Sequence, residues 1–134
     1  MIFFTHIAFS LLLMELLGLG IGGLPLLLIG ALLPDADSEH SLLGRFLLLW
    51  LVLRHRGILH NAFLPFLFYP YSKHLAVGYF SHILLDTFTV QGVRPFQPIS
   101  DFRASGPLES ASFFFNLALT ALFLGFMLLL PRPA

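Results

Sequence analysis

The sequence predicts an all-α polytopic membrane protein with about four transmembrane or half-spanning helices, one interfacial helix, and a metal site at one membrane face. Of its residues, 57% are hydrophobic and 10% charged, against about 25% charged in soluble domains, and the mean hydropathy is +0.90. A soluble chain of this length has too little interior to hide so much apolar surface. His82 and Asp86, four residues apart in an apolar run, share one helix face and can reach one ion. We expect a single integral-membrane domain over residues 1–134.

The first apolar stretch predicts two helices rather than one. Residues 2–33 are too long for one ordinary span, and several glycines and Pro25 interrupt them. We therefore expect a helix near 3–18, a glycine-rich turn, and a second helix near 24–33 that ends before Pro34.

The middle segments are shorter than the ~20 residues that a membrane-crossing helix needs. Residues 41–53 are apolar but form a short run, which favours an interfacial helix. Residues 58–70 and 74–89 predict two further helices, separated by a turn at Pro70. We expect tilted half-spans, which are tolerated where they line a polar cavity inside the protein.

The C-terminal part combines a loop with the longest apolar run. Residues 90–107 are polar and rich in proline and glycine, which predicts a loop. Residues 108–130 are almost uninterruptedly apolar, which predicts the longest transmembrane helix.

Alternating the direction of these helices brings the candidate metal ligands to one membrane face, provided that residues 41–53 do not cross. The expected ligands are His6, Asp35, Asp37, His60, His82 and Asp86. Five arginines fall on the same side: Arg45, Arg54, Arg56, Arg94 and Arg103. The positive-inside rule then predicts a multi-pass protein of the inner membrane, with the site facing the cytoplasm and the C-terminus outside.

The residue types restrict which ion the protein can bind and which class of partner it can have. Without cysteine, an ion must be held by histidine and carboxylate, which favours Zn²⁺ and leaves Mn²⁺ or Fe²⁺ open, as one or two ions. The formal net charge of zero argues against a nucleic-acid partner, and the apolar surface predicts membrane lipids as partners. His40, His55 and Glu109 are left open as further ligands.

Each motif also has a plain structural interpretation. Asp35-Ala36-Asp37 follows a predicted helix end, where an Asp-x-Asp pair binds cations but also occurs in solvated turns. His55 and His60 are five residues apart and do not share a helix face, so we expect His60 to enter the site. The His82–Asp86 pair can satisfy itself, yet a polar pair inside apolar sequence still calls for a further partner.

The motifs stand in a recognisable order along the chain: Thr5-His6, Leu33-Pro34-Asp35-Ala36-Asp37, His55-Arg56-Gly57 with His60, and Gly78-Tyr79-Phe80-Ser81-His82 with Asp86 and Thr89. From about residue 1 to 110, this order resembles the YdjM-like family of LexA-regulated inner-membrane proteins, described as membrane-bound metal-dependent hydrolases. Leu59 and Asn61 depart from the family, which carries hydroxyl residues at these two positions.

A more distant resemblance concerns the order of the ligands. It is similar to that of zinc-dependent phospholipase C and P1-type nucleases, which hydrolyse phosphoesters with a zinc cluster: His6, Asp35, His60, His82 and Asp86. Apart from Glu109, no counterpart of the later ligands follows, so this resemblance implies one or two ions rather than three.

The leading hypothesis is a membrane-embedded metal-dependent hydrolase that acts on a phosphoester of a lipid or other amphiphile. The ion would lower the pKa of a bound water to about 7 and polarise a phosphoryl oxygen. Asp86 can bridge two ions, and Asp35 or Asp37 can act as ligand or general base. Arg56 can hold a phosphate by bidentate hydrogen bonds.

Two other functions use the same residues. In the first, the ion only ties short helices together, and a closed coordination shell would favour this interpretation. In the second, the protein transports a metal or protons, for which intramembrane histidine and aspartate are equally suited.

Overall fold

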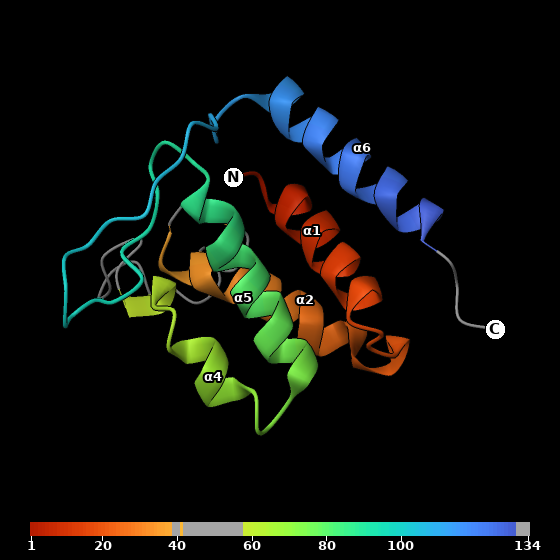
Figure 1. The fold of residues 1–134 in the computed structure, drawn as a ribbon, viewed down its shortest axis with the longest axis horizontal. Coiled ribbons are helices and arrows are strands. Elements are labelled where there is room, and N and C mark those ends of the chain that lie inside the picture. The colour runs from red at the N-terminus through yellow and green to blue at the C-terminus, as the bar shows by residue number, and fades with distance from the viewer. Residues whose placement is uncertain (39–40, 42–57, 131–134) are drawn as a thin grey trace.

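The computed structural model describes residues 1–38, 41 and 58–130, and this part of the chain is helical (Figure 1). Its α-helices are α1 (Phe3–Leu16), α2 (Leu24–Leu32), α4 (Leu64–Phe68), α5 (Lys73–Thr87) and α6 (Phe113–Leu129). Short 3₁₀ turns lie between them: η1 (Ile21–Gly23), η2 (Leu33–Asp37) and η4 (Ile58–His60). The helices predicted near 3–18, 24–33 and 74–89 are confirmed by α1, α2 and α5.

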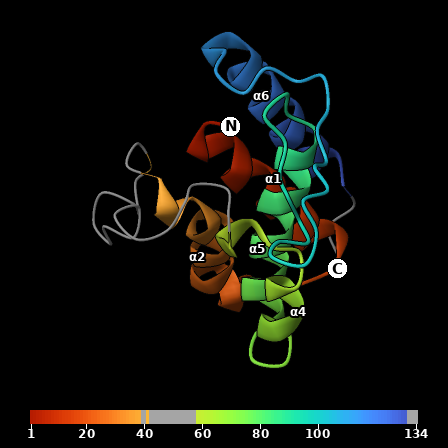
Figure 2. The same ribbon diagram turned by 90° about the vertical axis from the view of Figure 1, so that its left-hand side faces the viewer.

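The centre of the fold is the pair α2 and α5, which cross in direct contact (Figures 1 and 2). Helix α1 packs on both of them, α4 packs on α5, and α6 lies against α1 at the outer edge. A buried cluster of Tyr79, Ile83 and Val93 supports the site from α5 and the following loop. The ends of α1, α2 and α5 that carry polar residues thereby come together.

Local capping fixes where the helices begin and end. Gly18 adopts a φ of +62° after α1, and its amide donates to Glu15 O while that of Leu19 donates to Met14 O, both at 3.0 Å. This Schellman motif ends α1. Ser72 and Ser112 are N-caps, because their hydroxyl oxygens accept from Leu75 N and Phe115 N, at the starts of α5 and α6.

The membrane topology predicted from the sequence is wrong. Among the described residues, no helix is both long enough and apolar enough to cross a membrane. The apolar runs are divided by the turn at Gly18, and the run that begins at residue 108 becomes helical only from Phe113. The prediction of four transmembrane or half-spanning helices is therefore corrected, together with the orientation derived from it. The interfacial helix predicted over residues 41–53 falls almost entirely outside the described residues.

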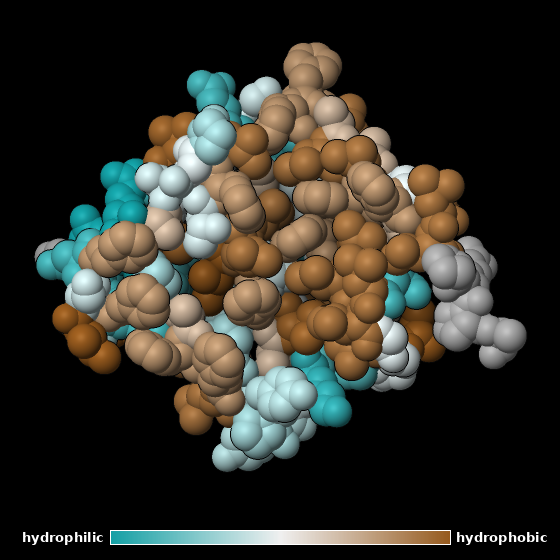
Figure 3. Space-filling model, viewed as in Figure 1, coloured by the Kyte–Doolittle hydropathy of each residue, from teal (hydrophilic) through white to brown (hydrophobic). Residues whose placement is uncertain are grey.

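Two other segments also have local reasons for their shape. Residues 58–70, predicted as one helix, form η4 and α4 separated by a turn, where Asn61 Oδ1 accepts from Phe63 N at 2.8 Å. Residues 90–107 are a loop, as predicted, held by paired hydrogen bonds between Val93 and Ala104. Hydrophobic residues cover much of the face in Figure 3. The exposed hydrophobic side chains of the protein include Phe114 of α6, which is 81% exposed.

Candidate metal centre

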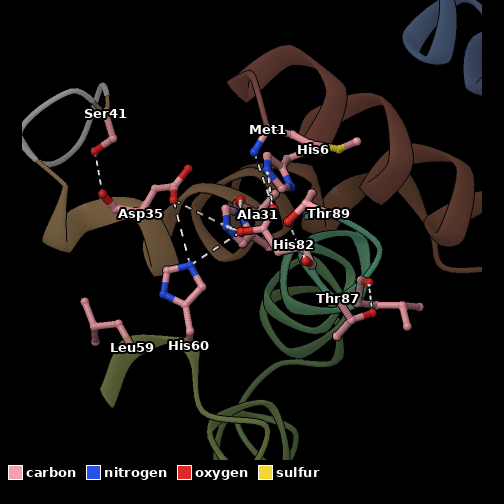
Figure 4. A network of polar contacts seen from close by, with 12 residues as sticks. Met1, His6, Ala31, Asp35, Ser41, Leu59, His60, His82, Thr87 and Thr89 are labelled. Carbon is pink, nitrogen blue, oxygen red and sulfur yellow. Dashed lines mark hydrogen bonds and ion pairs between the residues drawn. The ribbon is translucent and has the colours of Figure 1, made fainter. Parts of the chain in front are cut away.

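Four elements bring six titratable side chains into one buried cluster. They are His6 from α1, Asp35 and Asp37 from η2, His60 from η4, and His82 and Asp86 from α5. Figure 4 labels four of them, His6, Asp35, His60 and His82. All six were expected from the sequence. The three imidazoles are fully buried, and among the carboxylates only Asp35 is partly exposed, with 20% of its side chain accessible.

The donor atoms of this cluster lie close enough to share ions. His82 Nε2 is 3.5 Å from Asp35 Oδ1 and 3.7 Å from Asp86 Oδ2, and His60 Nε2 is also 3.7 Å from Asp86 Oδ2. Two overlapping groups have donors within 4.8 Å of one another: His6 with Asp35 and His82, and His60 with His82 and Asp86. Buried imidazole and carboxylate donors at this spacing can hold a divalent ion.

The orientation of His82 is fixed by the contact between α2 and α5. Its Nδ1 lies 2.7 Å from the carbonyl oxygen of Ala31, so this nitrogen carries the proton and donates to the carbonyl. The other nitrogen, Nε2, then points at Asp35 and Asp86. Such a hydrogen bond from the second ring nitrogen is the usual way in which proteins orient a metal-binding histidine.

His60 is held from both sides of its turn. The Tyr79 hydroxyl on α5 donates to the carbonyl of Leu59 at 2.5 Å. On the other side, the Asn61 side-chain amide donates to the carbonyl of Gln97, which ties η4 to the loop that follows α5. Leu59 and Asn61 therefore support His60 through a backbone carbonyl and a side-chain amide.

Asp37 lies on the far side of the His60 ring. Its Oδ2 is 3.8 Å from His60 Nδ1, whereas the Nε2 of the same ring faces Asp35 and Asp86. Asp37 belongs to neither donor group found among the described residues. Asp37 is therefore placed to orient the His60 ring. Its role as a direct metal ligand stays a prediction.

A buried amide that the sequence analysis missed holds the start of α1. Asn116 of α6 is fully buried, and its Oδ1 accepts from Ile2 N at 3.1 Å and from Thr5 Oγ1 at 3.0 Å. Its Nδ2 donates to the carbonyls of Ser110 and Ser112. Asn116 thus anchors α6 to the residue that precedes His6. The available signal was a single amide within the apolar run of residues 108–130.

The charges of the cluster shift its pKa values in opposite directions. Burial alone would raise the pKa of Asp35, but the neighbouring His82, His6 and His60 lower it far below its usual range. Burial alone would lower the pKa of His82, but Asp35 and then Asp86 raise it above the ordinary 6.5. A negative charge on Asp35 and a positive charge near His82 are therefore both favoured, which suits a position for a cation.

Other candidates lie elsewhere or outside the described residues. Glu109 is exposed and belongs to neither donor group. His74, at the opposite end of α5, bonds the carbonyl of Gly20 at 2.7 Å. His40, His55 and Arg56 fall on residues that the structure does not describe.

The chain also has a family relationship. Residues 1–132 match the family described as YdjM inner membrane protein, so the resemblance seen in the motifs is confirmed. Neither a curated protein nor a solved structure matches the chain. The match supports membrane localisation, and hydrolase activity remains a prediction.

Proposed function

The chain belongs to the YdjM inner membrane protein family, and we propose that it is a metal-dependent hydrolase that acts at that membrane. The observation that carries the proposal is the convergence of His60, His82 and Asp86 within a buried cluster. The rings of His60 and His82 are inclined at 67°, and both Nε2 atoms lie 3.7 Å from the same oxygen of Asp86. Inclined rings can direct both lone pairs at one ion, as a tetrahedral zinc site requires.

The ion would supply the reactive water. A bound divalent metal lowers the pKa of its water to about 7 and polarises a phosphoryl oxygen. Asp35 is the carboxylate best placed to accept the proton of that water, because it is the partly exposed member of the cluster. Asp37, on the other nitrogen of His60, would hold that ring in the orientation needed for binding.

The exposure of Asp35 also gives the direction from which a substrate arrives. The remaining members of the cluster are at most 1% exposed, so a reacting group reaches the ion past Asp35. The substrate class we propose is a phosphoester of a lipid or other amphiphile, since the family is one of inner-membrane proteins. Arg56, expected from the sequence to hold the phosphate, is outside the described residues.

The experiment measures metal content and hydrolysis in the same purified protein. We expect at least one equivalent of zinc or manganese per chain, lost in His82→Ala and retained in His74→Ala, whose histidine lies away from the cluster. Release of phosphate or headgroup from phospholipids and isoprenoid phosphates in mixed micelles should stop on chelation and return with Zn²⁺ or Mn²⁺. Arg56→Lys should lower turnover without loss of metal, because lysine keeps the charge but not the planar fork.

A structural metal is the second candidate, and the depth of the cluster favours it. An ion held by His60, His82 and Asp86 would tie η4 and α5 together without reacting. Fully metallated protein that hydrolyses none of the substrates and has a closed coordination shell would establish this alternative instead.

A further inference from the structure

We propose that the loop after α5 is the surface with which the protein contacts the phospholipid headgroups of the membrane. Four exposed hydrophobic side chains, called here the loop patch, and two arginines beside them make this contact. The loop patch consists of Phe63, Phe96, Ile99 and Phe102, and the arginines are Arg94 and Arg103. Membership of the family places the chain at the inner membrane, and the loop patch identifies the face that meets lipid. The inference goes beyond the proposed hydrolase activity and does not require it.

The loop patch lies on a loop with a defined backbone. Val93 and Ala104 close this loop by two hydrogen bonds of 2.8 and 2.9 Å. Between them, the carbonyl oxygen of Phe96 accepts from Ile99 N at 2.9 Å and from Ser100 N at 3.0 Å, which forms a turn. Val93 is buried against α5 and anchors the loop to the core. The loop therefore presents its hydrophobic side chains from an ordered structure.

The aromatic members of the loop patch pack on one another at the surface. The ring centroids of Phe63 and Phe96 are 6.0 Å apart, and those of Phe96 and Phe102 are 6.2 Å apart. Phe63 and Phe102 are nevertheless more than half exposed, and Ile99 is 81% exposed. Contiguous exposed hydrophobic side chains mark a surface that contacts a membrane or another protein. At a membrane, such side chains insert at the boundary between headgroups and acyl chains.

The two arginines favour phospholipid over a protein partner. Arg103 is exposed, and its guanidinium is held beside the loop patch because it donates to the carbonyls of Val90 and Gln91, both at 3.0 Å. Arg94 lies 3.8 Å from Asp101, but both side chains are exposed, so this ion pair contributes little. Residues 90–107 thus carry two positive charges and one negative charge. Guanidinium groups bind phosphate oxygens, which lie next to the apolar layer in a phospholipid membrane.

The loop patch is also joined to the turn that carries His60. Ala62 N donates to the carbonyl of Pro95 at 2.9 Å, and the side-chain amide of Asn61 donates to that of Gln97. The loop accordingly lies beside η4 in Figure 1. Contact between the loop patch and lipid would hold this end of the molecule, with the candidate metal centre, at the level of the headgroups.

Helix α6 offers a second exposed hydrophobic surface, which includes Phe114. Its sequence, Phe113–Leu129, contains neither lysine nor arginine, so it has no cation for a lipid phosphate. We therefore assign the contact with headgroups to the loop patch, and the experiment compares the two surfaces.

Spin labelling can locate the contact, because the native chain has no cysteine. A nitroxide is attached to Ile99→Cys, and in a second preparation to Tyr71→Cys at the opposite end of α5. The full-length proteins are reconstituted in vesicles of phosphatidylethanolamine and phosphatidylglycerol. Relaxation of the label by oxygen, which concentrates in lipid, is compared with relaxation by a water-soluble nickel chelate. We expect oxygen to dominate at Ile99→Cys and the nickel chelate to dominate at Tyr71→Cys.

Three further substitutions identify the groups that hold the label in lipid. Phe102→Ser, combined with Ile99→Cys, should shift the oxygen-to-nickel ratio toward the value at Tyr71→Cys. Phe114→Ser, on the surface of α6, is the matched control and should leave the ratio at Ile99→Cys unchanged. Arg94→Gln should also shift the label toward water, and this shift should be smaller in vesicles of phosphatidylcholine, which have no net charge.

The outcomes decide the inference independently of the hydrolase. A label at Ile99→Cys that is as accessible to the nickel chelate as the label at Tyr71→Cys overturns it, and so does equal exposure of both labels to lipid. It is also wrong if Phe114→Ser, rather than Phe102→Ser, moves the label, because the contact then lies on α6. Circular dichroism checks the fold of each variant. If Phe102→Ser does not fold, the comparison of the two labels decides. Metal content and hydrolysis test the proposed function separately.

Discussion

Gly30 of α2 and Gly78 of α5 face each other where the two helices cross. A Cβ atom on Gly78 would collide with the carbonyl oxygen of Leu27, and one on Gly30 would collide with that of Leu75. Because both residues lack a side chain, the backbones of α2 and α5 touch at this point. The contact places the Ala31 carbonyl 2.7 Å from His82 Nδ1, and so the packing of two glycines orients a proposed metal ligand.

Replacing Gly78 with alanine should therefore weaken both the fold and the metal centre. The new methyl group meets backbone rather than a flexible side chain, and overpacking of this kind costs about 1–3 kcal/mol. We expect a lower free energy of unfolding and a weaker affinity for Zn²⁺, measured by denaturant titration and by competition with a chromophoric chelator. The control is Gly125→Ala in α6, where a Cβ meets nothing within 4 Å. Equal destabilisation in the control would contradict the proposed role of the helix crossing.

The cluster was largely predictable because its residues are conspicuous in this sequence. Histidines and aspartates within apolar runs need partners, and the four-residue spacing of His82 and Asp86 places them on one helix face. All six expected ligands meet in the structure. The spacing of residues along the chain does not determine the orientation of each imidazole ring. The position of Asp37 beside Nδ1 of His60 depends on that orientation.

The membrane topology failed for a different physical reason. Hydropathy reports how apolar a run is, whereas the length of a helix depends on its end signals. Leu108 illustrates this, because its amide donates to the Phe88 carbonyl and its own carbonyl accepts from Val90 N. These bonds keep the start of the last apolar run in the loop, and the helix begins only after Ser112. Asn116 was missed because its partner Thr5 lies 111 residues away.

Tyr79 should influence metal affinity although it belongs to neither donor group of the cluster. Tyr79→Phe removes the donor to the Leu59 carbonyl and leaves that oxygen, half-buried beside His60, without its hydroxyl. Loss of such a bond costs about 1–3 kcal/mol, and we expect Zn²⁺ affinity to fall while the helix content is unchanged. Calorimetric titration measures the affinity, and Tyr71→Phe, at a side chain 85% exposed, is the matched control. A Tyr79→Phe protein with wild-type affinity would show that η4 is held by other contacts.

Asn116 should couple α6 to the start of α1. Asn116→Leu keeps a similar volume but removes the acceptor for Ile2 N and Thr5 Oγ1 and the donor to two serine carbonyls. We expect faster hydrogen exchange in the first turn of α1 and weaker metal binding by the cluster to which His6 belongs. Leu117→Ala, at a neighbouring residue that is half exposed, should change neither measurement. Unchanged exchange in Asn116→Leu would mean that α6 does not support His6.

Metal affinity and the stability of the metal-free protein should respond to pH in opposite directions. In the metal-free protein the pKa of His82 is raised above 6.5, chiefly by Asp35 against the effect of burial. Protonated His82 therefore stabilises the fold fully below pH 6.5, and this contribution is lost as pH rises through the raised pKa. An ion needs the same imidazole in its neutral form, so the proton competes with the metal, and affinity should rise about tenfold per pH unit for each proton released.

The measurement combines two titrations of the same preparation. Zn²⁺ affinity, determined against a chelator of known pH dependence, should increase from pH 6 upward and level off above the pKa of His82. The melting temperature of the metal-free protein should fall over that interval. Below pH 3.8 the metal-free protein should lose stability again, because the pKa of Asp35 is depressed and its contribution disappears as pH falls. A metal affinity that is independent of pH would mean that His82 is already neutral without the ion, and the charge arrangement inferred for the cluster would then be wrong.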